Sequence, residues 1–380
     1  MRVLLAPDKF KGSLSALKVA QHLAAGLTRS LPGLDVVQAP VADGGDGTLD
    51  ALAPYGFTIK SATVTGSLGE PRVAAFGVRG TDGVIELAEA DGLRHLTADH
   101  RAPLTATSRG VGELIQAALD AGCRQLILGL GGSANTDGGA GLLQALGLRL
   151  LDAEGKEIGP GGAELIRLAS IDVRGLDGRL QDAAILLASD VDNPLLGPTG
   201  AAAVYAPQKG ATGKDVETLE AGLRQWAEIA ATTTGQDLSG RPGAGAAGGV
   251  GFGALTFLDA TLRPGIELVL DLAHFDDLLA GVSLVVTGEG SLDEQSLNGK
   301  APIGVAAAAA RQGIPTIAVA GRSLLSSEQS AAAGFKAVHA LIDREPDLGV
   351  CLTDAGRLLE ELAPDIIAAL PTEAAAQQPS

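Results

Sequence analysis

Short apolar runs that alternate with helical patterns constrain this chain more than any other feature. Residues 2–6 (RVLLA), which are apolar from Val3 onward, have the length of a strand and stop at Pro7 and Asp8. Leucines and alanines then recur on one face over residues 14–27, which predicts a helix, and Ser13 can cap its N-terminus. Strands that alternate with helices are joined by right-handed crossovers, which makes the sheet parallel. The sequence therefore predicts an α/β protein built on a parallel sheet.

The alternation occurs at both ends of the chain, and the middle differs. Near the C-terminus we expect strands at residues 283–287, 316–320 and 337–342, with an alanine-rich helix at 303–311. The middle of the chain mixes shorter alternating strands with helices and glycine-rich loops, and 380 residues exceed one ordinary domain. We predict one domain from residues 1–61 and 281–370, an inserted α/β domain at 62–280, and a tail at 371–380.

Composition excludes several classes of function. The chain has 28 basic and 45 acidic residues, which gives a formal net charge of −17. Nucleic acids and anionic membranes need a basic surface, so we expect neither as a partner. Cys123 and Cys351 are the only cysteines and lie far apart, which predicts no disulfide framework, no zinc site and a reducing, cytoplasmic setting. No run of 18 apolar residues predicts a membrane span.

Carboxylates follow several of the expected strands. Ligands of an open parallel sheet bind outside the carboxyl ends of its strands. A single Asp there is commonly a cap or turn residue, but acids at four strand ends are harder to assign to turns alone. Clustered carboxylates without zinc-type His or Cys suit a hard cation such as Mg²⁺, or a general base. The strand-end acids are Asp8, Asp43, Asp190 and Glu289, with Asp46, Asp192 and Asp293 a few residues beyond.

Two glycine-rich segments are candidate anion-binding loops. Residues 129–139 (GLGGSANTDGG) follow an apolar strand and precede a helix, so successive backbone N–H groups could hold a phosphate. Residues 242–249 (PGAGAAGG) also precede a helical stretch. The alternatives are a plain strand-to-helix turn for the first segment and a flexible hinge loop for the second.

The first glycine-rich segment also matches part of a dinucleotide-binding fingerprint. Gly129, Gly131 and Ala134 fit G-x-G-x-x-A, with Asp152 about 20 residues beyond. Residues 135–139 intervene before the expected helix, so a pyrophosphate would not lie on the helix end. No Walker A motif is present. A nicotinamide-dependent reductase of small hydroxy acids stays the alternative function, and a non-catalytic binding protein for sugar acids is the third.

Basic side chains beside these segments are informative because cations are scarce in this chain. A solvated surface position is the usual one for each Lys or Arg. An anionic substrate or a transferring phosphoryl group would need two or three of them. The candidates are Lys9, Lys11, Lys209, Lys300 and Arg322.

Long motifs match one enzyme family in the same order along the chain. They are APDKFKGSLSA (6–16), ADGGDGT (42–48), GLGGSANTDGGAG (129–141), ASDVDNPLLGPTGA (188–201), PQKGAT (207–212), PGAGAAGGVGFG (242–253), PGIELVLD (264–271), TGEGSLDEQSLNGKAPIGVA (287–306) and AVAGR (318–322). On these motifs the chain resembles bacterial glycerate kinases of the type that phosphorylates the 2-hydroxyl. Asp46 stands where the family often has Glu, and Ser291 stands where Arg is frequent.

The resemblance implies both an architecture and a reaction. The architecture is a flavodoxin-like domain formed by the chain ends with a second α/β domain inserted. The reaction converts D-glycerate to 2-phosphoglycerate with ATP and Mg²⁺ as cofactors. Phosphoryl transfer depends on positioning and charge neutralisation more than on covalent chemistry, so the glycine loops and strand-end acids are the parts to assign.

The site assignments follow from these parts. We predict that Gly131, Gly132 and Ser133 hold the ATP phosphates and that Gly245 and Gly248 assist. The predicted catalytic residues are Asp190, Asp43 and Lys11, the predicted metal ligands are Asp192 and Glu289, and the predicted substrate-binding residues are Asp8, Lys300 and Arg322. Which carboxylate is the base and which the metal ligand stays open, as does assembly into a homodimer.

Overall fold

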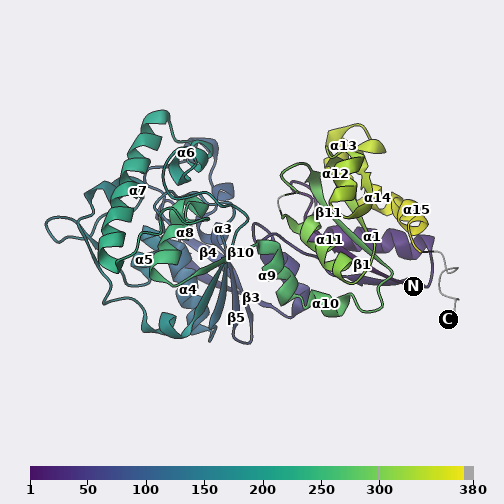
Figure 1. Cartoon of the computed structure of the whole chain (residues 1–380), viewed down its shortest axis with the longest axis horizontal. Helices are drawn as coiled ribbons and strands as arrows, with labels where there is room; N and C mark the ends of the chain where they lie inside the picture. The colour runs from purple at the N-terminus through teal and green to yellow at the C-terminus, as the bar shows by residue number, and fades with distance from the viewer. Residues whose placement is uncertain (298, 372–380) are drawn as a thin grey trace. The chain divides into compact units, whose positions relative to one another are not determined.

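The structure is a computed structural model that describes residues 1–297 and 299–371 (Figure 1). Contacts among these residues group the chain into two compact units. The first unit contains Met1–Asp43, Asp50–Tyr55 and the chain from Pro264 onward, and the second contains Gly44–Leu49 and Gly56–Arg263. The tail expected at 371–380 lies outside the described residues apart from Pro371.

The first unit is built on a five-stranded parallel sheet in the order β13-β12-β11-β1-β2. Counted along the chain within this unit, the order is 2-1-3-4-5, which is that of flavodoxin-like folds. The predicted α/β class with a parallel sheet is therefore confirmed. The strands are β1 (Arg2–Pro7), β2 (Asp35–Gln38), β11 (Leu284–Leu292), β12 (Thr316–Ser323) and β13 (Phe335–Ala340).

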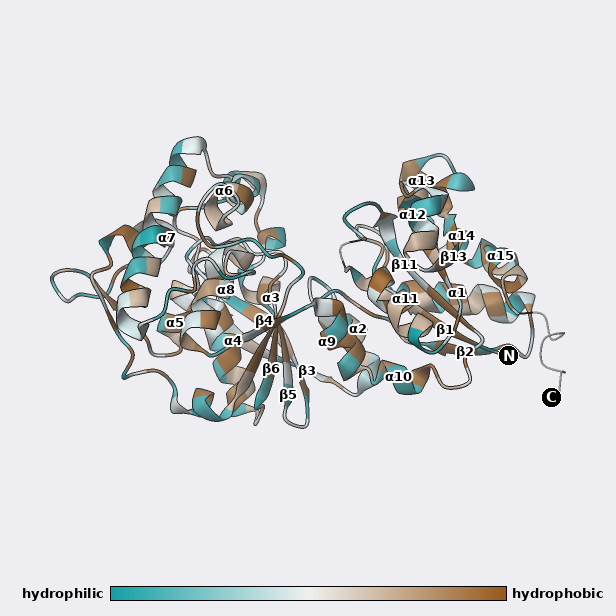
Figure 2. Cartoon of the chain, viewed as in Figure 1, coloured by the Kyte–Doolittle hydropathy of each residue, from teal (hydrophilic) through white to brown (hydrophobic). Residues whose placement is uncertain are grey.

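Helices cover both faces of this sheet because alternate strand residues point to opposite sides. Val3, Ile317 and Val319 pack in one cluster with α1, α14 and α15, whereas Ala318 and Ala320 pack in another with α11. Strand β1 is apolar along most of its length (brown in Figure 2). The helices of this unit are α1 (Ala16–Ser30), α9 (Gly265–Leu272), α10 (Phe275–Leu278), α11 (Ala301–Arg311), α12 (Ser327–Ala332), α13 (Leu348–Thr353), α14 (Ala355–Glu361) and α15 (Ala363–Ala368), with the short η7 (Leu341–Asp343) and η1 (Ala53–Tyr55).

Two local features of the first unit differ from the sequence pattern. The cap of α1 is Ser15, whose side chain accepts from Lys18 N–H, and not Ser13. Ser13 lies in a turn closed onto Phe10 and its hydroxyl donates to Leu352 O at 2.6 Å. Helix α9 belongs to the first unit and packs against α11, where a Cβ at Gly304 would clash with the Ile266 side chain.

The second unit is built on a six-stranded mixed sheet in the order β10-β9-β6-β5-β4-β3. Strands β5, β6, β9 and β10 are parallel neighbours, and β3 and β4 extend the sheet as an antiparallel pair. The strands are β3 (Thr58–Thr65), β4 (Pro71–Arg79), β5 (Asp82–Glu86), β6 (Gln125–Gly129), β9 (Ala184–Ala188) and β10 (Thr261–Arg263), with β7 (Arg149–Leu151) and β8 (Ser170–Asp172) in a small separate sheet.

The core of the second unit gathers around Trp226 of α7. Its ring stacks on Phe257 at 5.4 Å between centroids and meets the edge of Phe252 at 6.0 Å. Its indole N–H donates to Gly138 O at 3.0 Å, which ties the core to the glycine-rich segment after β6. The helices are α2 (Thr48–Leu52), which begins here, α3 (Leu87–Asp91), α4 (Arg109–Asp120), α5 (Ala140–Ala145), α6 (Ala201–Tyr205), α7 (Gly213–Thr234) and α8 (Ala246–Phe257), with the short η2 (Leu93–His95), η3 (Ala98–His100), η4 (Gly162–Arg167), η5 (Gly178–Asp182) and η6 (Pro207–Lys209).

None of the helices in the described part of the chain combines the length and the apolar composition that a bilayer crossing needs.

Candidate functional site

The first unit collects three acids at the carboxyl end of its sheet. Asp8 follows β1, and its N–H donates to Gly288 O of the neighbouring strand β11 at 2.8 Å. Glu289 is the next residue of β11, so the two acids come from adjacent parallel strands. The charge of Asp43, which follows β2, raises the pKa of both. The structure thus brings Asp8, Asp43 and Glu289 together, as expected for acids at the carboxyl ends of strands in one parallel sheet.

Burial raises the pKa of two of these acids, Asp8 and Glu289. Asp8 is 6% exposed, and burial raises its pKa to about 7, although Lys9, with Nζ 3.7 Å from Oδ1, opposes that rise. Burial also raises the pKa of Glu289, whose Oε2 lies 4.0 Å from Lys300 Nζ. A carboxyl whose pKa lies near neutrality can exchange a proton at physiological pH, which is the property a general base needs.

Three basic side chains of the first unit lie on or next to strands β1, β11 and β12. Arg322 of β12 pairs in register with Ser291 of β11, and its Nε donates to Ser291 Oγ at 3.0 Å. Lys300 directly precedes α11 and is half-buried. Lys11 is exposed in the loop after β1, and its backbone N would lie 3.1 Å from a Cβ at Gly290. Lys11, Lys300 and Arg322 therefore all belong to the first unit, as the three acids do.

The second unit holds the glycine-rich loop that follows β6. The N–H groups of Gly131, Gly132 and Ser133 donate to no acceptor among the described residues. The loop is nevertheless fixed on both sides, because Leu93 N–H donates to Gly132 O at 2.8 Å and Ala134 N–H donates to Asp91 O at 2.9 Å. Three successive unpaired amides in a fixed loop are suited to an anion.

Close backbone packing also requires the glycines of this loop, a reason that the sequence analysis did not find. The ADGGDGT segment packs directly on the loop, so a Cβ at Gly129 would lie closer than 3.0 Å to Gly44 O, and one at Gly131 would lie 2.9 Å from Gly45 Cα. Gly132 has a φ of +74°, which strains any residue with a Cβ. Because glycine has no side chain, the two backbone segments can pack closely. The unpaired N–H groups, and not the glycines as such, support phosphate binding.

Glu86 and Arg94 hold the ADGGDGT segment in place. The Glu86 carboxylate accepts from Gly47 N–H at 3.2 Å and from Leu49 N–H at 2.7 Å. Arg94 donates to Asp46 Oδ1 at 2.6 Å, and burial raises the pKa of Glu86 to about 7. Neither residue was predicted as functional, although Glu86 ends a strand and carries the same signal as the acids that were.

The 242–249 segment packs against the first loop. Gly245 N–H donates to Asn193 O at 2.9 Å, and a Cβ at Gly248 would clash with Asn135 O. Helix α8 is broken within this segment, because Ala247, Gly248 and Gly249 all have positive φ. The structure gives Gly245 and Gly248 a packing role, and their role toward phosphate stays a prediction.

Asp190 and Asp192 lie in the exposed segment after β9. Leu130 N–H donates to Ala188 O at 3.2 Å, so this segment leaves the sheet beside the glycine-rich loop. Burial and then the Asp192 charge raise the pKa of Tyr205, whose hydroxyl donates to Asn193 Oδ1 at 2.5 Å. The side chains of both acids are exposed.

Asp152 is the residue that a dinucleotide site would use to bind a ribose, but its carboxylate already accepts hydrogen bonds within a turn. Its Oδ1 accepts from Glu154 N–H at 3.1 Å and from Lys156 N–H at 2.9 Å. Its Oδ2 accepts from Arg167 at 3.0 Å. This arrangement explains Asp152 without a nucleotide.

The predicted site residues fall into two groups, one in each unit. The predicted metal ligands Asp192 and Glu289 belong to different units, and no group of three His, Cys, Asp or Glu suited to a metal occurs among the residues the structure describes. Mg²⁺ is commonly held by one or two carboxylates together with substrate phosphates. Asp192 and Glu289 each offer only oxygen donors, so either could be the single carboxylate that fits that chemistry.

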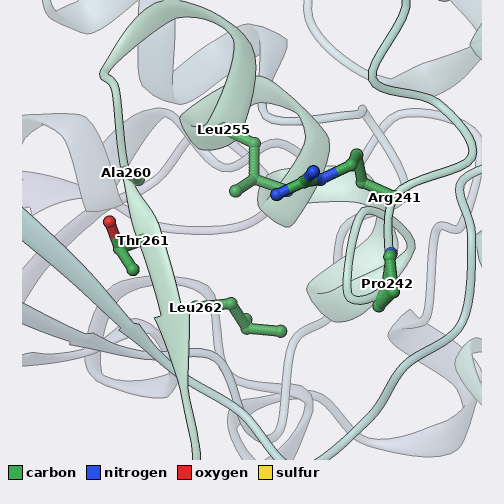
Figure 3. Close-up of a pocket in the computed structure, with 6 residues that line it drawn as sticks. All are labelled: Arg241, Pro242, Leu255, Ala260, Thr261 and Leu262. Atoms are coloured by element: carbon green, nitrogen blue, oxygen red, sulfur yellow. The ribbon is translucent and has the colours of Figure 1, made fainter.

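A pocket of about 480 Å³ lies elsewhere in the second unit (Figure 3). Its walls come from β10, α8 and the turn before α8, and Figure 3 shows the Arg241 side chain extended toward Leu255. None of the predicted site residues lines it. The lining residues are Arg241, Pro242, Leu255, Ala260, Thr261 and Leu262.

Comparison with known proteins gives one consistent family. The model of the glycerate kinase family matches residues 3–371. The chain is 47% identical to the glycerate kinase of Bacillus subtilis (strain 168), over 97% of this chain and 98% of that one. It is 46% identical to the glycerate 2-kinase of Escherichia coli (strain K12), over 84% of this chain and 85% of that one.

A solved structure agrees with these matches. The fold is similar, with a TM-score of 0.85 and 42% identity, to a crystal structure from Salmonella typhimurium LT2 that is assigned to glycerate kinase 2. The similarity covers 97% of this chain and 98% of that chain. The resemblance indicated by the sequence motifs is confirmed, and the reductase alternative has no support among these proteins.

Proposed function

The chain belongs to the glycerate kinase family, and on that premise we propose that it transfers the terminal phosphoryl group of ATP to the 2-hydroxyl of D-glycerate. The products are ADP and 2-phosphoglycerate. The observation that carries this proposal is the set of unpaired N–H groups at Gly131, Gly132 and Ser133, which gives a phosphate three donors without a Walker A loop.

The acids supply the proton acceptor. An alcohol is a poor nucleophile at neutral pH, so a carboxylate that takes its proton assists the attack. Asp190 is the first candidate because it is exposed beside the glycine-rich loop, and Asp43 is the second. The pKa of Asp8, about 7, makes that residue a third candidate in addition to its predicted role in binding substrate.

Cations balance the charge of the substrates. Lys11, Lys300 and Arg322 are proposed to neutralise the glycerate carboxylate and the transferring phosphoryl group. Lys11 lies in the loop that also holds Asp8, Lys300 Nζ lies 4.0 Å from Glu289 Oε2, and Arg322 pairs in register with the strand that carries Glu289. Mg²⁺ bound with the nucleotide would supply charge neutralisation on the phosphates, held by Glu289 and its neighbours or by Asp192. Magnesium suits these carboxylates because they offer oxygen ligands alone.

The setting of the enzyme is part of the same proposal. Cys123 and Cys351 are both free and buried, which is consistent with a cytoplasmic protein. A homodimer, and a domain formed by both chain ends with a second domain inserted between them, also belong to the proposal.

The test is an ADP-release assay on the purified protein with ATP, Mg²⁺ and D-glycerate. ADP release that requires all three supports the proposal. Oxidation of NADH with hydroxypyruvate, in the absence of any ATP turnover, would establish the reductase instead. Glycerate binding without transfer or hydrolysis would establish a binding protein.

A further inference from the structure

Lys209 occupies an unusual position for a lysine. It is 2% exposed, and within the described residues it is the only Lys or Arg that is buried. Lysines are mostly solvated, and a buried ammonium needs partners that replace water. The solvated position expected from the sequence is therefore wrong for Lys209.

A tight turn directs this side chain inward. Lys209 ends the short helix η6, which begins at Pro207. Gly210 follows with a φ of +97°, and its N–H donates to Pro207 O at 3.0 Å. Ala211 N–H then donates to Ala206 O at 3.1 Å. These backbone hydrogen bonds hold the turn independently of the contacts that the Lys209 side chain makes.

The ammonium contacts the loop with the unpaired amides. Nζ donates to Ser133 Oγ at 2.9 Å and to the backbone carbonyl of Asn135. The Asn135 side chain donates in turn to Asp91 Oδ2, and Asp91 O accepts from Ala134 N–H. Lys209 and Asp91 therefore hold residues 133–135 from two sides, directly after the amides of residues 131–133.

Two buried acids face the ammonium. Asp137 is satisfied by neighbours, because it accepts from Ser108 N–H at 2.8 Å, from Ser108 Oγ at 3.0 Å and from the N–H groups of Gly139 and Gly141. Asp91 keeps an Oδ1 that is buried and has no hydrogen-bond partner among the described residues. Burial lowers the pKa of Lys209 to about 8, and the charges of Asp91 and Asp137 oppose that change.

We propose that Lys209 is a positioning residue that fixes Ser133 and Asn135 and thereby holds the amides of residues 131–133 in the conformation that binds nucleotide phosphates. The inference rests on the proposed function, because it takes the nucleotide as the ligand of that loop. Lys209 acts through the loop, since its donors are directed to Ser133 and Asn135 in the protein interior.

The experiment measures ADP affinity by calorimetry from pH 7.5 to 9.5. The ionisation of ADP is nearly complete over this range, because the second pKa of a phosphate group is about 6. The wild-type affinity is expected to fall as Lys209 loses its proton at about pH 8. Lys209→Met is expected to bind ADP at least about tenfold more weakly at pH 7.5, because a misplaced binding group has effects of that order, and to show a flat profile.

The matched control is Lys214→Met, which removes an exposed lysine five residues along the chain and is expected to behave as wild type. In kinetics, Lys209→Met should raise KM for ATP and leave KM for D-glycerate unchanged. A general loss of folding would instead lower the apparent kcat and leave both KM values unchanged.

The outcomes separate this inference from the proposed function. A wild-type protein that binds ADP with the expected pH profile, but does not phosphorylate glycerate, contradicts the proposed function and supports the role of Lys209. An active enzyme whose ADP affinity is the same in Lys209→Met overturns the inference. Ser133→Ala, which removes the hydroxyl that Nζ contacts, is expected to weaken ADP binding as well, and an unchanged ADP affinity of this variant overturns the inference even if Lys209→Met does not fold.

Discussion

Asp8→Asn is expected to stabilise the protein and to impair its activity. The folded protein holds the pKa of Asp8 at about 7, against an ordinary value of 3.8. Between these two pH values the folded state binds more protons than the unfolded state, so stability falls as the pH rises. The whole interval corresponds to about 4 kcal/mol, at about 1.4 kcal/mol per pH unit. The wild-type protein therefore carries this cost at pH 8 and only a part of it at pH 5.

Asparagine removes the cost and keeps the local hydrogen bond. Its side-chain oxygen can accept from Lys9 N–H as Asp8 Oδ1 does at 2.6 Å. The free energy of unfolding of Asp8→Asn, relative to wild type, is expected to increase by about 3 kcal/mol between pH 5 and pH 8. Urea denaturation at the two pH values measures this difference.

The matched control is Asp50→Asn, since Asp50 is exposed in the same unit. The difference in free energy of unfolding between Asp50→Asn and wild type should be the same at pH 5 and pH 8. Parallel curves for Asp8→Asn and wild type would refute the reasoning, because they would mean that burial does not penalise the Asp8 charge. Loss of activity together with gained stability is the pattern of a residue kept for function.

Three further predictions concern other parts of the site. Asp190→Asn is expected to lower kcat about 100-fold with little change in KM for ATP if Asp190 is the base, and a near-normal kcat in steady-state assays would remove it from the site. Gly129→Ala places a Cβ against Gly44 O and is expected to lower the free energy of unfolding by at least about 2 kcal/mol, measured by urea denaturation. Gly213→Ala, whose Cβ would meet no atom within 4 Å, should not lower it, and equal stabilities of the two variants would contradict the packing argument. Glu86→Ala removes the acceptor of two backbone donors and is expected to cost about 1–3 kcal/mol in urea denaturation at pH 5, where the Glu86 carboxyl is mostly neutral in the folded state and relief of its charge contributes little. An unchanged midpoint would count against the role given to Glu86.

The local patterns of the sequence predict much of the fold of the first unit. Each strand of its sheet is a short apolar run, and the acids Asp8 and Glu289 lie next to each other because adjacent parallel strands end at one edge. The cap of α1 differs by two residues, since Ser13 and Ser15 are both good caps and only the turn at Phe10 decides between them. Family membership was predictable because long motifs carry it.

The burial of Lys209 could not be predicted in the same way. Its acceptors Ser133 and Asn135 come 76 and 74 residues earlier in the chain, so no local pattern places them beside it. The same holds for the glycines at 129 and 131, whose requirement comes from a segment that packs on them from far earlier in the sequence. Long-range contacts of this kind decide which glycines serve packing and which amides stay open to a ligand.

The product of the reaction tests the central claim most directly. After incubation with ATP, Mg²⁺ and D-glycerate, phosphorus NMR without proton decoupling distinguishes the two monophosphates of glycerate. A phosphoryl group on the 2-hydroxyl couples to a single carbon-bound proton and gives a doublet, and one on the 3-hydroxyl couples to two and gives a triplet. A doublet that grows together with ADP is the predicted result. A triplet, or ADP that forms without any new phosphate ester, would contradict the account.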